Sequence, residues 1–353
     1  MEALLGKTLV ELQEVALSVG LPKFAGKQLA EWLYGRRVCS FDEMTNISLK
    51  GREALKAQYS IGRSMPVREA VSKDGTRKYL FRLSAINSQS SEQFIESVYI
   101  PEEERATLCV STQAGCKMGC RFCMTGTLGF HGHLTAADIL NQVFSIDQLP
   151  ITNNQSPITN LVLMGEGEPM DNLDNVLRAL EIMTADYGCA WSPKRITVST
   201  VGVPTMMRFL DESECHLAVS MHNPFPMERA QIMPAEKLFS ITQVVELLKQ
   251  YDWSHQRRVS FEYICWCGQN DTPRHAKELL RLLKGLNCRV NLIRFHEGVD
   301  RRFPSSDEKT MEWLRDYLTE KGLTTTIRRS RGEDILAACG MLVNALQDST
   351  ASC

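Results

Sequence analysis

The chain has 353 residues, 43% hydrophobic and 23% charged, which is typical of a globular protein and excludes a disordered one. Lys and Arg number 40 against 42 Asp and Glu, so the net charge of −2 excludes a generally basic nucleic-acid coat but allows local basic patches. No stretch of about 18 apolar residues is present, and Lys7, Glu11 and Glu14 interrupt the apolar N-terminus. We therefore expect a cytoplasmic protein with no membrane span.

Residues 1–62 are expected to form a small helical accessory domain. Apolar residues recur at helical spacing in 22–34, at Leu29, Trp32 and Leu33. Residues 1–80 hold 13 Lys and Arg against 9 Asp and Glu, which favours RNA docking by this domain. A solvated charged face would explain the same surplus equally well.

Residues 63–106 are expected to form a β-rich connecting region. Asp74-Gly75 is a hairpin signal, strand patterns follow at 79–83 and 94–100, and the polar run 87–92 predicts a loop.

From residue 107 to 340, short apolar runs alternate with helical patterns. This alternation predicts parallel strands, in an α/β barrel or a doubly wound sheet. The strands are predicted at 107–111, 160–164, 195–200, 216–220, 259–264, 290–295 and 324–328. The helices are predicted at 135–146, 172–187, 241–250, 273–286 and 306–321, and residues 341–353 form a tail.

The notable polar motifs follow the ends of these predicted strands. They are Gly165-Glu166-Gly167-Glu168-Pro169, Ser199-Thr200, Ser220-Met221-His222 and His296. In a barrel of parallel strands the chemistry is located at the carboxyl ends of the strands, so we expect these motifs to surround one site.

Twelve cysteines are unusual in a long chain without an export signal, and they favour thiolates used for metal binding or catalysis. Cys116, Cys120 and Cys123 form a CxxxCxxC loop after a predicted strand. Three thiolates would leave one iron of a cubane cluster open to a further ligand. A zinc site is the alternative, with Cys109, His131 or His133 as the fourth ligand. The scattered Cys189, Cys215, Cys265 and Cys288 are expected to be small buried residues.

The cysteine loop, the GEGEP motif and the alternating body resemble the radical S-adenosylmethionine (SAM) superfamily. Two further segments narrow the resemblance to the RlmN family and its Cfr-type relatives. One is 94–111, which contains Glu96 and Cys109, and the other is 331–340, with the sequence RGEDILAACG. The resemblance covers nearly the whole chain. It implies a partial (β/α)6-type radical SAM barrel preceded by the helical accessory domain and the hairpin region.

The resemblance also implies a function. Members of the RlmN family methylate C2 of an adenine in 23S rRNA and of adenine 37 in tRNA, using a [4Fe-4S] cluster and two SAM molecules per turnover. Cys116, Cys120 and Cys123 would be the cluster ligands. Cys339 would carry the methyl group, Cys109 would release the product by forming a disulfide with Cys339, and Glu96 would accept a proton.

The residues that match SAM-contacting positions of the family are Gly167, Glu168, Ser199, Ser220, Met221, His222 and His296. The chain departs from the family pattern at Glu166, where many relatives have Met, and at His296, where they have Asn. For several of these residues, and for Glu96 and His222 in particular, a purely structural role is the competing interpretation.

The resemblance implies further partners and alternatives. An electron donor such as flavodoxin with its reductase is expected, and the protein is expected to be a monomer. RNA contacts are expected at Arg257-Arg258, Arg301-Arg302, and Arg328-Arg329 with Arg331. The alternative reactions are Cfr-type methylation of adenine C8, or a zinc-stabilised RNA-binding module without chemistry.

Overall fold

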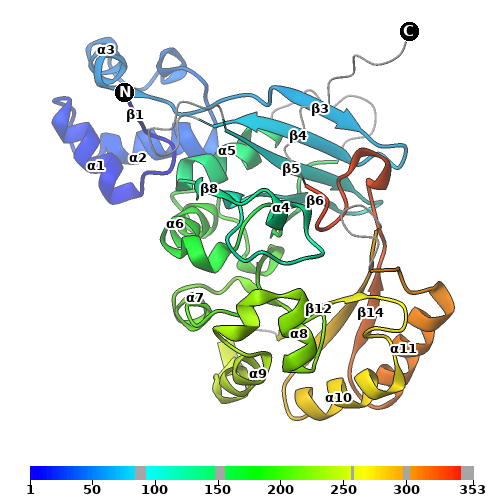
Figure 1. The fold of residues 1–353 in the computed structure, drawn as a ribbon. Helices are drawn as coiled ribbons and strands as arrows, with labels where there is room; N and C mark the ends of the chain where they lie inside the picture. Colours follow the sequence, from blue (N-terminus) through cyan, green and yellow to red (C-terminus); the bar gives the residue numbers. More distant parts are fainter. Residues whose placement is uncertain (84–92, 148–155, 256–257, 297–302, 343–353) are drawn as a thin grey trace, which may run out of the picture.

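The computed structural model of the chain describes residues 1–83, 93–147, 156–255, 258–296 and 303–342. Its centre is a ten-stranded sheet with the order β14-β13-β12-β11-β10-β9-β6-β5-β4-β3 (Figure 1). The predicted loop at 87–92, the Arg257 and Arg301-Arg302 positions and the tail from residue 343 lie outside the described residues.

Seven neighbouring strands of the sheet are parallel, as the alternation of strands and helices predicts. They are β6 (Ala106–Cys109), β9 (Asn160–Leu163), β10 (Ile196–Thr200), β11 (His216–Ser220), β12 (Val259–Cys265), β13 (Cys288–Arg294) and β14 (Thr325–Arg328). The predicted α/β fold is therefore confirmed.

The side chains of alternate residues in these strands point to opposite faces of the sheet. On β12, Phe261 and Tyr263 pack in the hydrophobic core, while Ser260 and Glu262 line a cavity on the other face. Helices cover the core face: α5 (Ala136–Asp147), α6 (Leu173–Thr184), α7 (Met206–Glu212), α9 (Ile241–Gln250), α10 (Pro273–Leu283) and α11 (Glu308–Glu320). The sequence analysis identified all of these except α7. The short helix α8 (Pro226–Ile232), which lies between β11 and α9 in the chain, was not predicted either.

The connecting region extends the same sheet with antiparallel strands. These are β3 (Arg68–Val71), β4 (Arg77–Arg82) and β5 (Phe94–Pro101), and β5 pairs with β6. The turn between β3 and β4 contains Gly75 at φ 85°, a conformation that favours glycine, which confirms the predicted hairpin.

The N-terminal region contains helices α1 (Leu9–Ser18), α2 (Ala25–Ala30) and α3 (Leu49–Gln58), grouped at one end of the sheet (Figure 1). The α1 helix begins at a capping box, in which Thr8 and Glu11 satisfy each other's backbone amides. The region is not entirely helical, because β1 (Glu2–Ala3) pairs in parallel with β2 (Tyr59–Ser60). The predicted helix over 22–34 begins only at Ala25 and ends in a π-helical turn, η1 (Glu31–Gly35).

A small two-stranded sheet flanks the cysteine loop and was not predicted from the sequence. It pairs β7 (Gln113–Gly115) with β8 (Phe130–His133), and the short helix α4 (Met124–Thr127) lies between them. The remaining elements are short 3-10 helices: η2 (Phe41–Glu43), η3 (Pro169–Asn172), η4 (Pro193–Arg195), η5 (Pro234–Lys237), η6 (Trp253–His255) and η7 (Glu333–Ile335).

Candidate active site

A cavity of about 600 Å³ lies on the inner face of the parallel strands. It is lined by all the residues expected at the site except Glu96 and Met221. The cysteine loop, the GEGEP loop and the C-terminal segment with Cys339 therefore meet around one space. Three predicted RNA contacts, Arg328, Arg329 and Arg331, line it as well.

The three cysteines of the loop follow β7 and lie on one wall of this cavity. Gly115 starts the loop at φ 70°, and a Cβ atom there would lie 1.9 Å from the carbonyl oxygen of Gly129. Cys116 donates its backbone N–H to that same carbonyl at 2.8 Å. The glycine thus allows the close approach that fixes the start of the loop.

The thiols of the loop are suited to a cationic group. Burial raises the pKa of Cys116 to about 12, and burial together with the nearby Cys123 and Cys116 raises the pKa of Cys120 well above its ordinary value. Gathering such thiolates costs free energy unless a cation binds them. Within the described residues, no three His, Cys, Asp or Glu side chains are placed to hold a single metal ion. In an iron–sulfur cluster each cysteine binds a different iron atom, so the three sulfur atoms need not converge on one point. The three thiols therefore fit a cluster better than a single zinc ion.

The GEGEP loop follows β9 and packs against the strand before the cysteine loop. Gly167 has φ 97°, and a Cβ atom there would lie 2.5 Å from Cβ of Gln113. Gln113 accepts a hydrogen bond from the backbone N–H of Glu168 at 2.9 Å. Glycine at 167 is thus required both by the backbone conformation and by the close packing.

Glu168 is buried at the edge of the cavity, and its carboxylate accepts hydrogen bonds from the backbone N–H groups of Met170 (3.1 Å) and Val201 (2.8 Å). Burial raises its pKa to about 7, against the lowering effect of these hydrogen bonds. Such a carboxylate can pair with the ammonium group of an amino-acid ligand.

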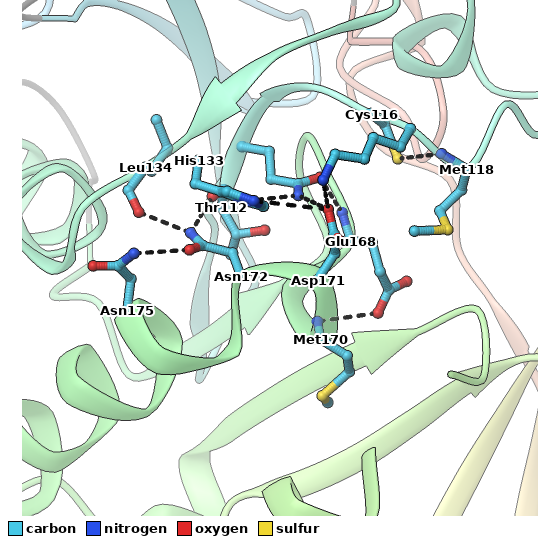
Figure 2. A network of polar contacts seen from close by, with 12 residues as sticks. Thr112, Cys116, Met118, His133, Leu134, Glu168, Met170, Asp171, Asn172 and Asn175 are labelled. Atoms are coloured by element: carbon cyan, nitrogen blue, oxygen red, sulfur yellow. Dashed lines mark hydrogen bonds and ion pairs between the residues drawn. The ribbon is translucent and has the colours of Figure 1, made fainter. Parts of the chain in front are cut away.

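A polar network around Asp171 links the two loops and was missed in the sequence analysis (Figure 2). Asp171 accepts a hydrogen bond from Nε2 of Gln113 at 2.7 Å and pairs with Nζ of Lys117, between the cluster cysteines, at 3.0 Å. The next residue, Asn172, donates to the carbonyl oxygens of Thr112 (2.8 Å) and Leu134 (2.7 Å). The signal available in the sequence was the polar pair Asp171-Asn172, which follows Met170 after the GEGEP motif.

Glu166 is one of the two departures from the family pattern, and the structure gives it a structural position. Its side chain is buried and accepts hydrogen bonds from the backbone N–H of Glu96 at 2.8 Å and of Gly115 at 3.4 Å. Glu166 thereby joins β5 to the start of the cysteine loop.

The strand ends place Ser199, Ser220 and His222 at the cavity, but Met221 packs in the hydrophobic core. The difference arises because successive side chains of an extended chain point to opposite faces. His222 has φ 56°, its Nδ1 accepts a hydrogen bond from the N–H of Ile264 at 3.1 Å, and burial lowers its pKa to about 3. A neutral imidazole is therefore fixed there.

Arg229 is fully buried beneath these strand ends and was not identified from the sequence. It donates hydrogen bonds to the carbonyl oxygens of Val201 (2.6 Å), Ser220 (2.8 Å) and Met221 (2.9 Å), and it forms an ion pair with Glu236. Arg229 thus satisfies carbonyl groups that the ends of β10 and β11 leave without strand partners.

His296, the second departure, lines the cavity beside the C-terminal segment. It hydrogen-bonds Ser330, and its Nδ1 lies 3.3 Å from Oε1 of Glu333. In this structure His296 therefore contacts the segment that leads to Cys339.

Cys109 and Cys339 line the same cavity although they lie far apart in the chain. Cys109 ends β6 and packs against Ala337 and Leu342 of the C-terminal segment. Burial, followed by the neighbouring Cys339, raises the pKa of Cys109 to about 12. Arg328 of β14 lines this part of the cavity too, and its Nη1 lies 3.3 Å from Oε2 of Glu262.

Glu96 is buried on β5, and its Oε1 pairs with Nζ of Lys78 at 2.9 Å. It is not among the residues that line the cavity. The structure thus places Glu96 next to a lysine of the neighbouring strand, which the sequence analysis had not singled out.

Comparison with known proteins agrees with this architecture. The family model for the "Ribosomal RNA large subunit methyltransferase N-terminal domain" matches residues 3–61, and that for the "Radical SAM superfamily" matches residues 110–283. A crystal structure of a radical SAM methyltransferase from Sphaerobacter thermophilus has a TM-score of 0.89 and 34% identity, covering 98% of this chain and 100% of that one.

Two relatives are similar to this chain over nearly its whole length. A protein of Bacteroides fragilis named "Probable dual-specificity RNA methyltransferase RlmN" is 57% identical over 350 residues, 98% of each chain. The "Dual-specificity RNA methyltransferase RlmN" of Marinobacter nauticus is 40% identical over 352 residues, covering 98% of this chain and 94% of that protein.

The fold and the cysteine loop define a radical SAM methyltransferase, an enzyme class that uses SAM and a [4Fe-4S] cluster. More particularly, the chain belongs to the RlmN family of dual-specificity RNA methyltransferases. The resemblance seen in the sequence is confirmed, and the comparisons give no support to the Cfr-type alternative. Among the described residues, none of the helices combines the length and apolar character needed to cross a membrane.

Proposed function

We propose that this enzyme methylates adenine C2 in 23S rRNA and in tRNA, with adenine 37 as the tRNA target. The observation that carries the proposal is the presence of Cys109 and Cys339 in the wall of the cavity that Cys116, Cys120 and Cys123 also line. Adenine C2 is neither acidic nor nucleophilic, so a direct attack on the SAM methyl group is not available. A cysteine that first carries the methyl group solves this problem.

Cys116, Cys120 and Cys123 are the proposed cluster ligands. When bound, the cluster supplies the electron that cleaves SAM reductively. SAM would be held in the same cavity by residues that line it: Gly167, Glu168, Ser199, Ser220, His222 and His296. Glu168 would pair with its ammonium group. Met221 would act only through packing, since its side chain lies in the core.

The chain's other side chains carry the group transfer. Cys339, exposed at the cavity, takes the methyl group from a first SAM by thiolate attack, and a second SAM is spent on activating that methyl group. A hydrogen atom would pass from the methyl group to the 5′-deoxyadenosyl part of the second SAM, and the remaining carbon would bond to C2 while still attached to the sulfur of Cys339. Glu96 would accept the proton lost from C2, and the electron spent on cleaving SAM would be returned. The Cys109 thiolate would then attack the sulfur of Cys339, so that the disulfide forms, the carbon–sulfur bond breaks, and the carbon takes up a proton to give methyladenine. Because Glu96 is paired with Lys78 and does not line the cavity, a side-chain movement would be needed to bring its carboxylate to the substrate.

The substrate and partners follow from the same chemistry. Arg328, Arg329 and Arg331 at the cavity would contact RNA phosphates, and the target adenine would be extruded from its stack to reach Cys339. The N-terminal helices would assist in docking the RNA. We also propose that the enzyme is a cytoplasmic monomer and that a flavodoxin-type donor supplies the electron for its cluster.

The test is mass spectrometry of 23S rRNA and tRNA fragments after incubation with anaerobically reconstituted enzyme, SAM and a reductant. Methyl groups on adenine C2 of both RNAs are expected. Methylation at C8 would move the enzyme to the Cfr-type reaction, and an intact cluster with no methylation would overturn the proposal. Cys339→Ala should abolish methylation, while Cys267→Ala, an exposed cysteine that does not line the cavity, should leave it unchanged.

A further inference from the structure

We propose that the turn of the β3–β4 hairpin is a dock that holds the C-terminal segment 330–342 and thereby positions Cys339 at the cavity. The inference rests on the proposed function of Cys339 as the methyl carrier. In Figure 1 the segment, drawn in red, lies beside the end of this hairpin. We name the residues 72–78 of the hairpin the dock and residues 330–342 the carrier segment.

Side chains of the dock and the carrier segment bind each other reciprocally. Asp334 accepts hydrogen bonds from Oγ of Ser72 at 2.5 Å and from the backbone N–H of Lys73 at 3.2 Å. In return, Asp74 accepts a hydrogen bond from the backbone N–H of Gly332 at 3.0 Å. A carboxylate from each partner therefore binds donors of the other, and charge-assisted hydrogen bonds of this type are stronger than neutral ones.

The packing at the dock requires a glycine in the carrier segment. Gly332 has φ 66°, and a Cβ atom there would lie 2.8 Å from Cγ2 of Thr76. The same Cβ atom would also lie 2.8 Å from Cβ of Ala337, two residues before Cys339. The segment therefore folds back tightly on itself where it meets the hairpin.

Lys78 connects the dock to the proposed proton acceptor. Its Nζ pairs with Oε1 of Glu96 at 2.9 Å and lies 3.4 Å from the carbonyl oxygen of Leu336. Lys78 is therefore a positioning residue between Glu96 and the segment that carries Cys339.

The other end of the carrier segment is fixed to the cysteine loop. The carbonyl oxygen of Gly340 accepts from the N–H of Met124 at 2.8 Å, and that of Leu342 accepts from Oγ1 of Thr125 at 3.0 Å. Cys339 thus lies between two attachments, one to the hairpin and one beside the cluster ligands. Regular secondary structure in the described part of the segment is limited to the 3-10 turn η7, so these two attachments, together with the contacts of His296 to Ser330 and Glu333, set the position of the sulfur.

The decisive variant is Asp334→Ala, because Asp334 is exposed and its loss removes the hydrogen bonds from Ser72 and Lys73 without opening the core. We expect hydrogen–deuterium exchange of peptides covering 331–342 to become about tenfold faster in the full-length enzyme. Peptides of α11 should not change. Glu320→Ala, an exposed carboxylate at the end of α11, is the matched control and should exchange like the wild type.

Kinetics distinguish positioning from general damage. In Asp334→Ala we expect kcat for RNA methylation to fall about tenfold, with KM for RNA and iron content unchanged, because misplacement of a reacting group slows chemistry without weakening binding. Ser72→Ala should reduce kcat by itself. In the Asp334→Ala background it should have little further effect, because both substitutions remove the same hydrogen bond between Ser72 and Asp334.

The outcomes separate this inference from the proposed function. Unchanged exchange and unchanged kcat in Asp334→Ala would overturn the dock, as would fully additive effects of the two substitutions. Absence of methylation by the wild-type enzyme would instead overturn the proposed function, and the exchange comparison would still decide whether the carrier segment is docked by the hairpin.

Discussion

Cys215, Cys265 and Cys288 are buried in the hydrophobic core, and burial raises the pKa of each thiol. They confirm the expectation of small buried residues, and Cys189 is half-buried against the same core. Cys339 differs from them because it is exposed at a cavity, where a thiol can meet a substrate. At the scale of the single residue, the surroundings of Cys339 and not its residue type distinguish this proposed methyl carrier from the cysteines of the core.

Cys109→Ala should trap a covalent complex between enzyme and RNA, because the bond between Cys339 and the methylated base can no longer be resolved. The complex should appear as a slowly migrating band on denaturing gels and disappear when Cys339→Ala is added. Cys215→Ala, which alters a core cysteine instead, should give no such band. Free methylated RNA at the wild-type rate from Cys109→Ala would contradict the proposed role.

Glu228 offers a test of pH dependence. Burial would raise the pKa of Glu228, but hydrogen bonds from Arg274 (2.5 Å), His275 (2.8 Å) and Asn223 (3.0 Å) outweigh it and lower the pKa to about 2. A lowered pKa in the folded state stabilises the protein above the unfolded value of 4.5, and this contribution is lost as the pH falls towards 2. Urea unfolding should therefore show Glu228→Gln as less stable than the wild type above about pH 5, and the difference should vanish between pH 4.5 and 2. A difference that stays constant over this range would contradict the prediction.

Loops at the carboxyl ends of the strands form most of the site, and each depends on a few close approaches. The GEGEP loop is held to β7 through Gly167 and Gln113, and the cysteine loop is held to β8 through Gly115 and Gly129. At the scale of the element, glycines allow two loops to share one wall of the cavity, since a side chain would separate them.

Gly167→Ala should therefore destabilise the enzyme and weaken SAM binding together. The added methyl group would meet Gln113 and would also be forced into a positive-φ conformation, at a cost of about 2 kcal/mol or more. Gly285→Ala has a similar φ of 85° but open space around the new methyl group, so it should cost only about 1 kcal/mol and leave SAM affinity unchanged. Urea unfolding and calorimetric titration with SAM measure both effects, and equal losses in the two variants would contradict the argument.

One hydrophobic core runs from Leu4 in the N-terminal region to Leu323 before β14. The N-terminal helices join the barrel at α5, where Tyr34 contacts Phe144 with ring centroids 6.3 Å apart, and Arg37 lies over the same ring. A Cβ atom at Gly6 would lie 2.7 Å from the backbone N of Ala137, so the two parts also meet through their backbones. At the scale of the whole molecule, the helical region and the barrel are packed as one body.

Phe144→Ala should lower the stability of the whole enzyme by about 3–5 kcal/mol, because it opens a cavity in the shared core. Scanning calorimetry should show a single transition at a lower Tm. Phe24→Ala, which alters a phenylalanine that is 65% exposed, should leave the Tm nearly unchanged. Two separate transitions, with only one moved by Phe144→Ala, would show that the helical region and the barrel unfold independently.

Local patterns in the sequence predicted much of the fold and part of the site. The alternation of short apolar runs with helical patterns located the parallel strands, Asp74-Gly75 located the hairpin, and the spacing of Cys116, Cys120 and Cys123 drew attention to the loop that lines the cavity. These features could be predicted because they depend on residues close together in the chain.

Other features depend on contacts between distant segments and left no local pattern. The sequence did not reveal the pairing of Glu96 with Lys78, the link from Asp171 to Lys117, or the burial of Arg229. It placed Met221 at the site, whereas the structure turns its side chain into the core.

The class of enzyme could be predicted from the sequence alone, because the cysteine spacing, the GEGEP motif and the segments around Cys109 and Cys339 are each short and local. How these segments meet could be seen only in the folded chain. The segment after β14 packs against the hairpin at the other edge of the sheet, which brings residues 72–78 against 331–336, and Cys109 and Cys339 line one cavity. The physical reason is that such contacts arise from the packing of whole strands and loops, and a residue's partner across the fold is not specified by its neighbours in the chain.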